Sequence, residues 1–469
     1  MARYRCVVCE YVYDEDNNDL PWCELSDDWP CPVCESPKKY YEVIEDAGTG
    51  DDTGKAEIET GTDTAQDLLR TFDEFESFMA DIHQMAETGQ SITEPMRTRN
   101  PTFSWDELLI KGAQLSKIPL NKSRTVSTDT IIGPGAAQPL KIAMPVYITH
   151  MSFGALSIEA KIALARGSAA VKTAMCSGEG GILPESYQSA YKYIFEYVPN
   201  RYSVTDENLK KVDAIEIKIG QSAKPGMGGH FPAEKVTREI ANLRGFEMGQ
   251  PITSPAHFED IRTRDDLKRK VDWLRDTSEG KPIGIKFAAG NVEADLEVAL
   301  FAKPDFITID GRAGATGSAP KFVKASTSVP TIFALYRVRR LMDKLNANNV
   351  SVVITGGLRI SSDFAKALAM GANAIAIGTT ALMAIGCQQY KMCHTGKCPM
   401  GIATQNPELR TRLKPEAAAK KLENFLTVSN EELKDFARLT GNADVHGLSL
   451  SDLCTTNSEI SNFTDIDHV

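Results

Sequence analysis

The chain has 469 residues, of which 42% are hydrophobic, and its net charge is −11. This length and composition predict a globular protein with one large domain and one or two small ones. The acidic balance argues against nucleic acid as a partner, because no basic patch is present to neutralise phosphates. No apolar run reaches the roughly 18 residues of a membrane span. We expect a cytoplasmic protein with no signal peptide ahead of Cys6.

Residues 1–44 contain two CxxC pairs, Cys6-Val-Val-Cys9 and Cys31-Pro-Val-Cys34. Four thiolates at this spacing predict a metal site, and a domain this short needs a metal to fold. Zinc ribbons use the same spacing, whereas the neighbouring aromatic residues favour a one-iron site. The aromatic core that we expect consists of Tyr11, Tyr13, Trp29 and Tyr40.

Two segments follow this small domain. Residues 45–66 are rich in Gly, Thr, Asp and Glu, which predicts a flexible acidic linker. Residues 67–145 are expected to form a helical lead-in to the next domain. Apolar residues recur at steps of three and four from Leu68 to Ile82, which predicts a helix that either packs on that domain or binds a partner.

Residues 146–425 alternate short β-rich runs with helix-length segments. This pattern is typical of a (β/α)8 TIM barrel, in the α/β class, with active residues where strands end and loops begin. We expect residues 426–469 to form a C-terminal extension. The predicted strands are Val146–Thr149, Thr173–Cys176, Ala214–Ile219, Ile252–Ser254, Ile283–Phe287, Phe306–Ile309, Val352–Ile354 and Ala374–Ile377.

Small residues follow the last two predicted strands. Thr355-Gly-Gly357 comes after the seventh strand and Gly378-Thr-Thr380 after the eighth. Such residues let backbone N–H groups approach an anion, so we predict a phosphate site that suits FMN or a phosphorylated substrate equally. No strand-linked GxGxxG motif predicts a dinucleotide fold, so electrons would come from a protein partner or from the chain's own metal sites.

Charged residues fall on the inward face of the predicted strands. Glu216 and Lys218 alternate with isoleucines, and charges inside a barrel are costly unless they are paired or functional. Lys218 either neutralises Glu216 or serves the site. Lys286 also faces inward, where a cation would stabilise the negative charge of a reduced flavin. Thr308 and Asp310 also fall on the inward face of their predicted strand.

Three further cysteines, Cys387, Cys393 and Cys398, lie within twelve residues after the last strand. Three thiolates on a short loop suit an iron–sulfur cluster, most naturally 3Fe–4S. A zinc ion with His394 as the fourth ligand is the alternative.

Residues 1–44 resemble a rubredoxin, through Tyr4-x-Cys6-x2-Cys9 and Asp27-Asp-Trp-Pro-Cys31-Pro-x-Cys34. Glu10 and Glu35 replace the glycines that the family has after each CxxC pair. The resemblance implies one iron bound by Cys6, Cys9, Cys31 and Cys34.

Residues from about 100 to 420 resemble the synthase domain of glutamate synthase. Matching motifs include His150-Met-Ser-Phe-Gly154, Ser177-Gly-Glu-Gly-Gly181 and Cys393-His-Thr-x2-Cys398-Pro. The resemblance implies catalytic residues Glu216, Lys224 and Lys286 near a 2-oxoglutarate pocket. It also implies a 3Fe–4S cluster on Cys387, Cys393 and Cys398. The residues implied to line FMN are Met151, Ser152, Ser177, Gln221, Lys286, Gly356, Gly357, Gly378 and Thr379.

The resemblance predicts a glutamate synthase-type oxidoreductase. It would reduce 2-iminoglutarate, formed from 2-oxoglutarate and ammonia, to L-glutamate with FMN, and electrons would arrive through rubredoxin iron and the 3Fe–4S cluster. The electron donor would be a ferredoxin or a reductase. The family's amidotransferase domain has no counterpart here, so ammonia would diffuse in or come from a separate glutaminase subunit. Alternatives are an N-methylglutamate synthase-type transferase and a non-catalytic electron-relay subunit, and a homo-oligomer is compatible with each.

Overall fold

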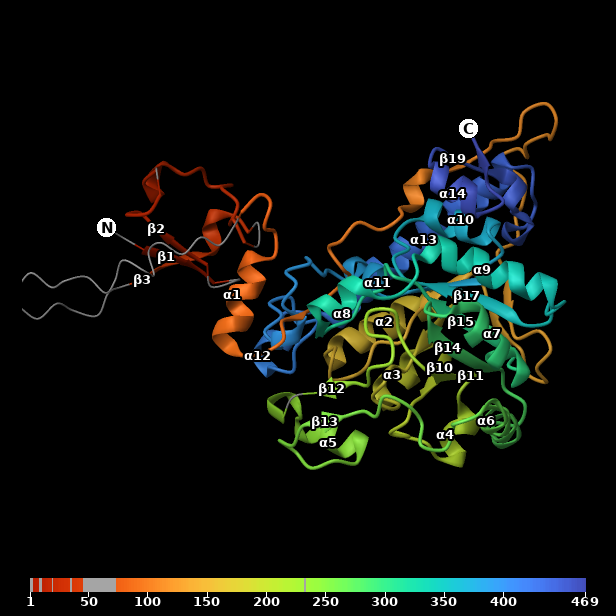
Figure 1. The fold of residues 1–469 in the computed structure, drawn as a ribbon, viewed down its shortest axis with the longest axis horizontal. Helices are drawn as coiled ribbons and strands as arrows, with labels where there is room; N and C mark the ends of the chain where they lie inside the picture. Colours follow the sequence, from red (N-terminus) through yellow and green to blue (C-terminus); the bar gives the residue numbers. More distant parts are fainter. Residues whose placement is uncertain (1–2, 8–10, 19, 34–35, 45–72, 232) are drawn as a thin grey trace, which may run out of the picture. The chain divides into compact units, whose positions relative to one another are not determined.

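The computed structural model describes residues 3–7, 11–18, 20–33, 36–44, 73–231 and 233–469. The chain divides into an N-terminal unit, Met1–Ile92, and a larger second unit, Thr93–Val469. Figure 1 shows the course of the chain through its helices and strands.

The N-terminal unit contains a three-stranded antiparallel sheet in the order β2-β1-β3. Its strands are β1 (Arg3–Cys6), β2 (Val12–Asp14) and β3 (Tyr41–Ile44). An aromatic cluster packs beside the sheet, with ring centroids 4.3–6.0 Å apart. Tyr13 and Trp29 belong to it as predicted, whereas Tyr40 is exposed. The other members of the cluster are Tyr4, Trp22 and Tyr41.

The two CxxC segments begin with the same backbone geometry. Cys6 N donates to Tyr11 O at 2.7 Å, and Cys31 N donates to Ser36 O at 2.8 Å. Cys6 and Cys31 are both fully buried, as expected of metal ligands in so small a domain. The other two predicted iron ligands, Cys9 and Cys34, lie outside the described residues.

The predicted helical lead-in, 67–145, is helical over a short part of its length. Helix α1 (Met79–Thr88) ends at Gly89, whose φ of 62° is left-handed. Leu68, at the start of the predicted helix, lies outside the described residues. From Thr93 to Pro145 the prediction is wrong, because this segment forms short strands. They are β4 (Thr93–Glu94), β5 (Leu108–Ile110), β6 (Thr130–Ile132) and β7 (Leu140–Ile142).

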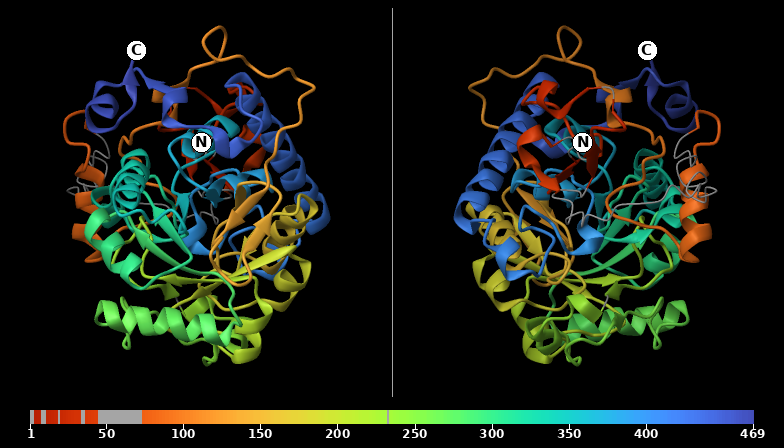
Figure 2. Two further views of the ribbon diagram at one scale, coloured as in Figure 1. Left: turned by 90° about the vertical axis from the view of Figure 1, so that its right-hand side faces the viewer. Right: turned by 90° about the vertical axis from the view of Figure 1, so that its left-hand side faces the viewer.

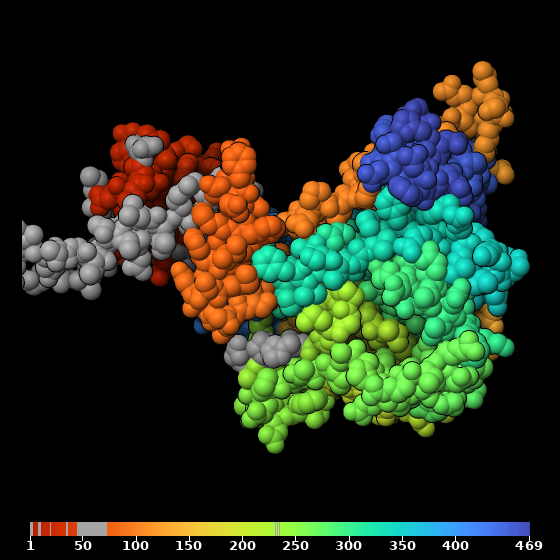
Figure 3. Space-filling model, viewed as in Figure 1, coloured from red at the N-terminus to blue at the C-terminus, as the bar shows by residue number. Residues whose placement is uncertain are grey.

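The second unit is built on a closed parallel barrel, which confirms the predicted fold class. The barrel strands are β8 (Val146–Ile148), β9 (Ala174–Cys176), β10 (Lys192–Tyr197), β11 (Ala214–Lys218), β14 (Ile283–Ala288), β15 (Phe306–Asp310), β17 (Ser351–Thr355) and β18 (Ala374–Ile377). The helices that follow them in turn are α2 (Ile158–Ala170), α3 (Pro184–Ser189), α4 (Asp206–Lys211), α6 (Arg264–Thr277), α7 (Val292–Phe301), α9 (Thr331–Lys344), α10 (Ser361–Ala369) and α11 (Thr379–Ala384). These helices surround the strands (Figure 2), and Figure 3 shows in space-filling form the face of the molecule that is seen in Figure 1.

The prediction that Ile252–Ser254 forms a barrel strand is wrong. Strand β13 (Ile252–Thr253) instead pairs antiparallel with β12 (His230–Phe231), in an excursion that also contains α5 (Arg238–Arg244). The strand that completes the barrel is β10, which the sequence reading passed over. β10 carries few aliphatic residues, because aromatic side chains occupy its outward positions and Glu196 points inward. A second excursion, between β15 and α9, holds β16 (Ala319–Pro320) and α8 (Lys321–Ser326).

The barrel interior is apolar at one end and charged at the other. Inward-facing Ala214 and Phe306, at the strand starts, pack with Ile132 and Leu140 of the β6–β7 hairpin, which closes that end. Polar side chains follow towards the strand ends. The charged layer is therefore held at the carboxyl ends of the strands, where barrel enzymes bind their substrates.

The C-terminal residues pack on the barrel's helices. Helix α13 (Pro415–Leu439) lies along α2, so the predicted domain boundary at residue 426 falls inside one helix. β19 (Leu453–Thr455) and β20 (Asp467–His468) complete a sheet with β5. The remaining helices are α12 (Pro407–Arg410) and α14 (Ser458–Phe463). Within the described part of the chain, every helix is too short or too polar to cross a membrane.

Candidate functional site

A cavity of about 530 Å³ lies at the carboxyl ends of the barrel strands, within the size range of cofactor sites. Eight of the nine predicted flavin-contacting residues line it. They are Met151, Ser152, Gln221, Lys286, Gly356, Gly357, Gly378 and Thr379. The ninth, Ser177, is buried away from the cavity, and its hydroxyl donates to Gly178 O at 3.2 Å and accepts from Glu196 N at 2.9 Å.

The two glycine segments predicted to bind phosphate meet in this cavity. Gly356 and Gly357 have φ values of 110° and 93°, which strongly favour glycine. A Cβ on Gly357 would lie 2.3 Å from Ala313 Cβ, so a side chain there would push the neighbouring loop aside. This backbone is therefore open to an anion on its cavity side, which fits the phosphate of FMN.

Arg359 is a cavity residue that the sequence reading missed, although it follows Gly357 by two positions. It is half-buried, and burial lowers the pKa of its guanidinium, as does the positive charge of nearby Arg97. An anion bound between the glycine segments and Arg359 would relieve both effects.

Lys286 lies on β14, 5% exposed, and lines the cavity as predicted. Glu216, on neighbouring β11, lies outside the cavity lining and is 1% exposed. Its Oε2 lies 3.1 Å from His150 Nε2, and its Oε1 accepts a hydrogen bond from the Thr308 hydroxyl. Burial alone would raise the pKa of Glu216, but hydrogen bonding and charge from His150, together with the charge of Lys286, lower it. Glu216 is therefore a carboxylate below the cavity floor.

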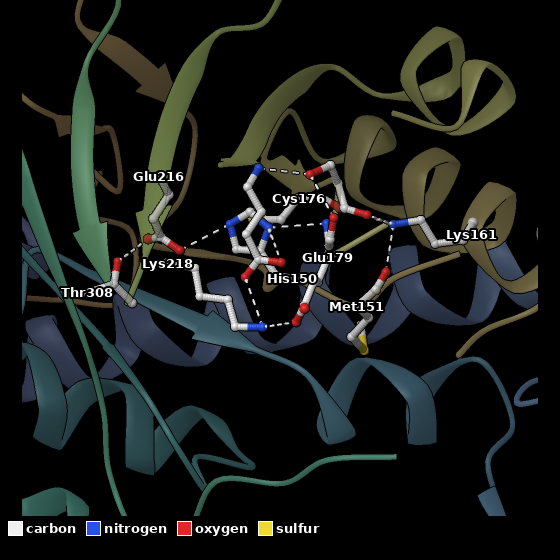
Figure 4. A network of polar contacts seen from close by, with 11 residues as sticks. His150, Met151, Lys161, Cys176, Glu179, Glu216, Lys218 and Thr308 are labelled. Carbon is white, nitrogen blue, oxygen red and sulfur yellow. Dashed lines mark hydrogen bonds and ion pairs between the residues drawn. The ribbon is translucent and has the colours of Figure 1, made fainter. Parts of the chain in front are cut away.

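Lys218 pairs with a residue that the sequence reading did not consider. Its Nζ donates to Glu179 Oε2, in the loop after β9, and lies 4.0 Å from Glu196 Oε1 (Figure 4). The prediction that Lys218 neutralises Glu216 is wrong. Burial would raise the pKa of Glu179, but the charge and hydrogen bond of Lys218 lower it to about 2. The cavity wall thus contains a permanent buried ion pair.

Two more cations line the cavity. Lys224, predicted from the resemblance, donates to Gly228 O at 3.2 Å, and burial followed by the charge of Lys218 lowers its pKa. Arg244, on α5, was missed because it lies in the excursion between two barrel strands. Its guanidinium lies 4.8 Å from the Phe231 ring, and Nη2 donates to Phe153 O at 2.8 Å. Its buried Nε has no hydrogen-bond partner in the described residues. Two cations that line one cavity suit a dicarboxylate.

The three clustered thiols lie beside this cavity, and Cys393 lines it. Burial, and then the charges of Cys387 and Cys398, raise the pKa of Cys393 to about 12. Cys387 Sγ accepts from the Gln389 side chain at 3.2 Å. Among the described residues, the three sulfurs do not form a group within 4.8 Å. Three thiols grouped beside the cavity are the residue type that binds iron–sulfur clusters.

Residues 79–443 match the family model described as the conserved region in glutamate synthase. A glutamate synthase large subunit-like protein of Rhizobium meliloti is 35% identical over 409 residues, which cover 83% of this chain and 92% of that protein. An archaeal-type glutamate synthase (NADPH) of Thermotoga maritima is 36% identical over 382 residues, 76% of this chain and 75% of that protein. A solved structure of a flavocytochrome b2 variant with sulfite bound aligns with a TM-score of 0.49 at 16% identity, over 74% of this chain and 76% of that one. The chain belongs to the glutamate synthase family.

Proposed function

We propose that the chain reduces 2-iminoglutarate, formed from 2-oxoglutarate and ammonia, to L-glutamate in the barrel cavity. The observation that carries this proposal is that one cavity joins a phosphate-binding backbone, an inward lysine, a pair of cations and a cysteine of the thiol cluster. Membership of the glutamate synthase family supports the same reaction.

FMN, when bound, would supply the hydride for this reduction. Gly356, Gly357, Gly378 and Thr379 would hold its phosphate, with Arg359 as a neutralising cation. Lys286 would stabilise negative charge on the reduced flavin, because a buried cation acts strongly where water is excluded.

The substrate would bind along the wall that carries Lys224 and Arg244. These two cations would hold the two carboxylates of 2-oxoglutarate, each through charge-assisted hydrogen bonds. Glu179 balances the charge of Lys218, so this lysine does not compete with Lys224 and Arg244 for the dicarboxylate. This arrangement selects a dianion over a neutral keto compound.

The cysteines would hold the metal centres that carry the electrons. Cys387, Cys393 and Cys398 would hold the 3Fe–4S cluster, and Cys6, Cys9, Cys31 and Cys34 would hold one iron in the N-terminal unit. Bound there, these metals supply one-electron transfer from a ferredoxin or reductase. Ammonia would enter free or from a separate glutaminase subunit.

The test uses the full chain purified without oxygen. Iron, acid-labile sulfide and FMN are measured, the flavin is reduced with dithionite, and 2-oxoglutarate and ammonium are added singly and together. Flavin reoxidation that requires both compounds supports the proposal. A flavin that stays reduced with both present would contradict it and favour an electron-relay subunit. Turnover of methylamine and glutamate without a reductant would instead identify an N-methylglutamate synthase-type transferase.

A further inference from the structure

Lys161 is a fully buried lysine that the proposed reaction does not use. It lies on α2, where the neighbouring buried residues are small or apolar. Its Nζ donates to three backbone carbonyls, Met151 O at 2.9 Å, Cys176 O at 3.1 Å and Ser177 O at 2.8 Å (Figure 4). Burial lowers the pKa of Lys161 to about 7, although the charges of Cys176 and Glu196 oppose this. A charge this costly to bury indicates a specific task.

The carbonyls that Lys161 binds belong to the loop after β8, to the last residue of β9 and to the loop that follows β9. These loops supply His150, Met151, Ser152 and Glu179 to the cavity wall. They also touch each other through their backbones: a Cβ on Gly178 would lie 2.4 Å from Met151 C and Ser152 N. Lys161 therefore holds together two loops that leave no room for a side chain between them.

One peptide group links Lys161 to His150. The carbonyl of Ser177 accepts from Lys161 Nζ, and the N–H of the same peptide, on Gly178, donates to His150 Nδ1 at 3.2 Å. The peptide is planar, so fixing its oxygen fixes the direction of its N–H. Because Nδ1 accepts this bond, the imidazole proton lies on Nε2, which is 3.1 Å from Glu216 Oε2 and makes no hydrogen bond to the residues that the structure describes.

The Nδ1–H tautomer of His150 would have a hydrogen-bond acceptor nearby, the carboxylate of Glu196. Glu196 Oε2 lies 3.8 Å from His150 Nδ1 on the same side as the Gly178 N–H. Glu196 Oε1 makes no hydrogen bond to any residue that the structure describes. If the Ser177–Gly178 peptide turned, the imidazole proton would move to Nδ1 and towards Glu196. Glu216 Oε2 would then lose the N–H that lies 3.1 Å away and favours its ionised form.

We propose that Lys161 is a positioning residue that sets the tautomer of His150 through the Ser177–Gly178 peptide. The ammonium holds the peptide oxygen, the peptide N–H holds Nδ1, and the imidazole proton stays on Nε2, beside Glu216. In this way a cation outside the cavity keeps the carboxylate below Lys286 charged. The inference about the tautomer does not depend on the proposed function. Only a catalytic role for Glu216 rests on it.

The test reads the tautomer directly. The full chain is labelled with ¹⁵N-histidine, and long-range ¹H–¹⁵N spectra are recorded for the wild type and for Lys161→Met, with His150 assigned by the signal lost in His150→Gln. We expect the Nε2–H tautomer in the wild type and a shift to the Nδ1–H form in Lys161→Met. A Lys161→Met chain that keeps the Nε2–H form would overturn the proposal. The spectra need neither substrate nor turnover, so this result is independent of the flavin reoxidation test.

Lys366→Met is the matched control. Lys366 is another buried lysine, on α10, and donates to Trp105 O at 2.9 Å. Its replacement should lower stability without changing the His150 tautomer, and a change there would also overturn the proposal. If Lys161→Met does not fold, Lys161→Gln, which keeps a neutral donor for the carbonyls, is measured with a mixed tautomer expected. If neither variant folds, Lys161 is a residue of the fold alone and the proposal fails.

Discussion

Lys218 on β11 forms its ion pair with Glu179, from the loop after β9, and leaves Glu216 on its own strand to His150. The side chains of Lys218 and Glu179 are 12% and 19% exposed, so this ion pair is largely removed from water. Glu216 and Lys218 both point inward, but they lie at different heights in the barrel. Glu179 thus balances the charge of Lys218 at the cavity wall, whereas Glu216 lies below the cavity and is left to His150.

Glu179→Gln should destabilise the second unit by about 3–5 kcal/mol, because it leaves Lys218 buried without its partner. Urea unfolding at pH 7 measures this free energy. Glu185→Gln, at an exposed position on α3, is the control and should change it by less than about 0.5 kcal/mol. Combining Glu179→Leu with Lys218→Met should recover most of the loss. A single variant as stable as the wild type would show that the pair contributes nothing.

The same pair should give the wild type an acid-sensitive stability. The folded-state pKa of Glu179, about 2, lies below the usual value of 4.5, so the carboxylate's contribution is present above pH 4.5 and is lost as the pH falls towards 2. Unfolding free energies measured between these pH values should therefore fall more steeply in the wild type than in Glu179→Gln. Parallel profiles would contradict this linkage.

Lys286→Met should slow substrate-linked flavin reoxidation by about 100-fold or more while weakening FMN binding by less than about tenfold. The lysine is expected to act on charge that develops in the reaction rather than on the resting cofactor. Stopped-flow absorbance gives the rate, and equilibrium dialysis gives the affinity. Lys281→Met, at the opposite end of β14, is the control for losing a lysine near that strand. Equal losses of rate and affinity would remove Lys286 from the chemistry.

Arg244→Lys should raise the KM for 2-oxoglutarate by about 10–100-fold, the effect of losing about 1.5–3 kcal/mol of charge-assisted hydrogen bonding. FMN content should be unchanged, because Arg244 is on α5 and is not part of the two glycine segments that would hold the phosphate. Arg238→Lys, an exposed arginine at the start of the same helix, should leave the KM as it is. A loss of FMN in Arg244→Lys, with an unchanged KM, would place this residue in the cofactor site instead.

Gly357→Ala should yield a folded chain that is purified with little or no FMN. The added Cβ would strain a backbone whose φ is 93° and would lie 2.3 Å from Ala313 Cβ, so the phosphate-binding backbone must move. Gly290→Ala is the matched control, because nothing lies within 4 Å of a Cβ there. The flavin-to-protein absorbance ratio measures the result, and a full complement of FMN in Gly357→Ala would place the phosphate elsewhere.

The sequence by itself determined which strands carry charge and which loops carry glycine. The period-two alternation around Glu216 and Lys286 is a local property of a strand, so it predicts an inward face without knowledge of the neighbours. The glycine segments after the last two strands and the cysteine spacing near Cys393 are local in the same sense. The tertiary structure decided which of these residues meet.

Barrel closure made β10 the third strand and thereby brought Glu196 beside His150. The folding of the loops turned Ser177 away from the cavity and carried Arg244 into it. Partner choice depends on strand order and loop paths over the whole chain, because a side chain pairs with whatever closure places within reach. Local patterns fix the direction in which Lys218 points, and only the closed barrel fixes Glu179 as its partner.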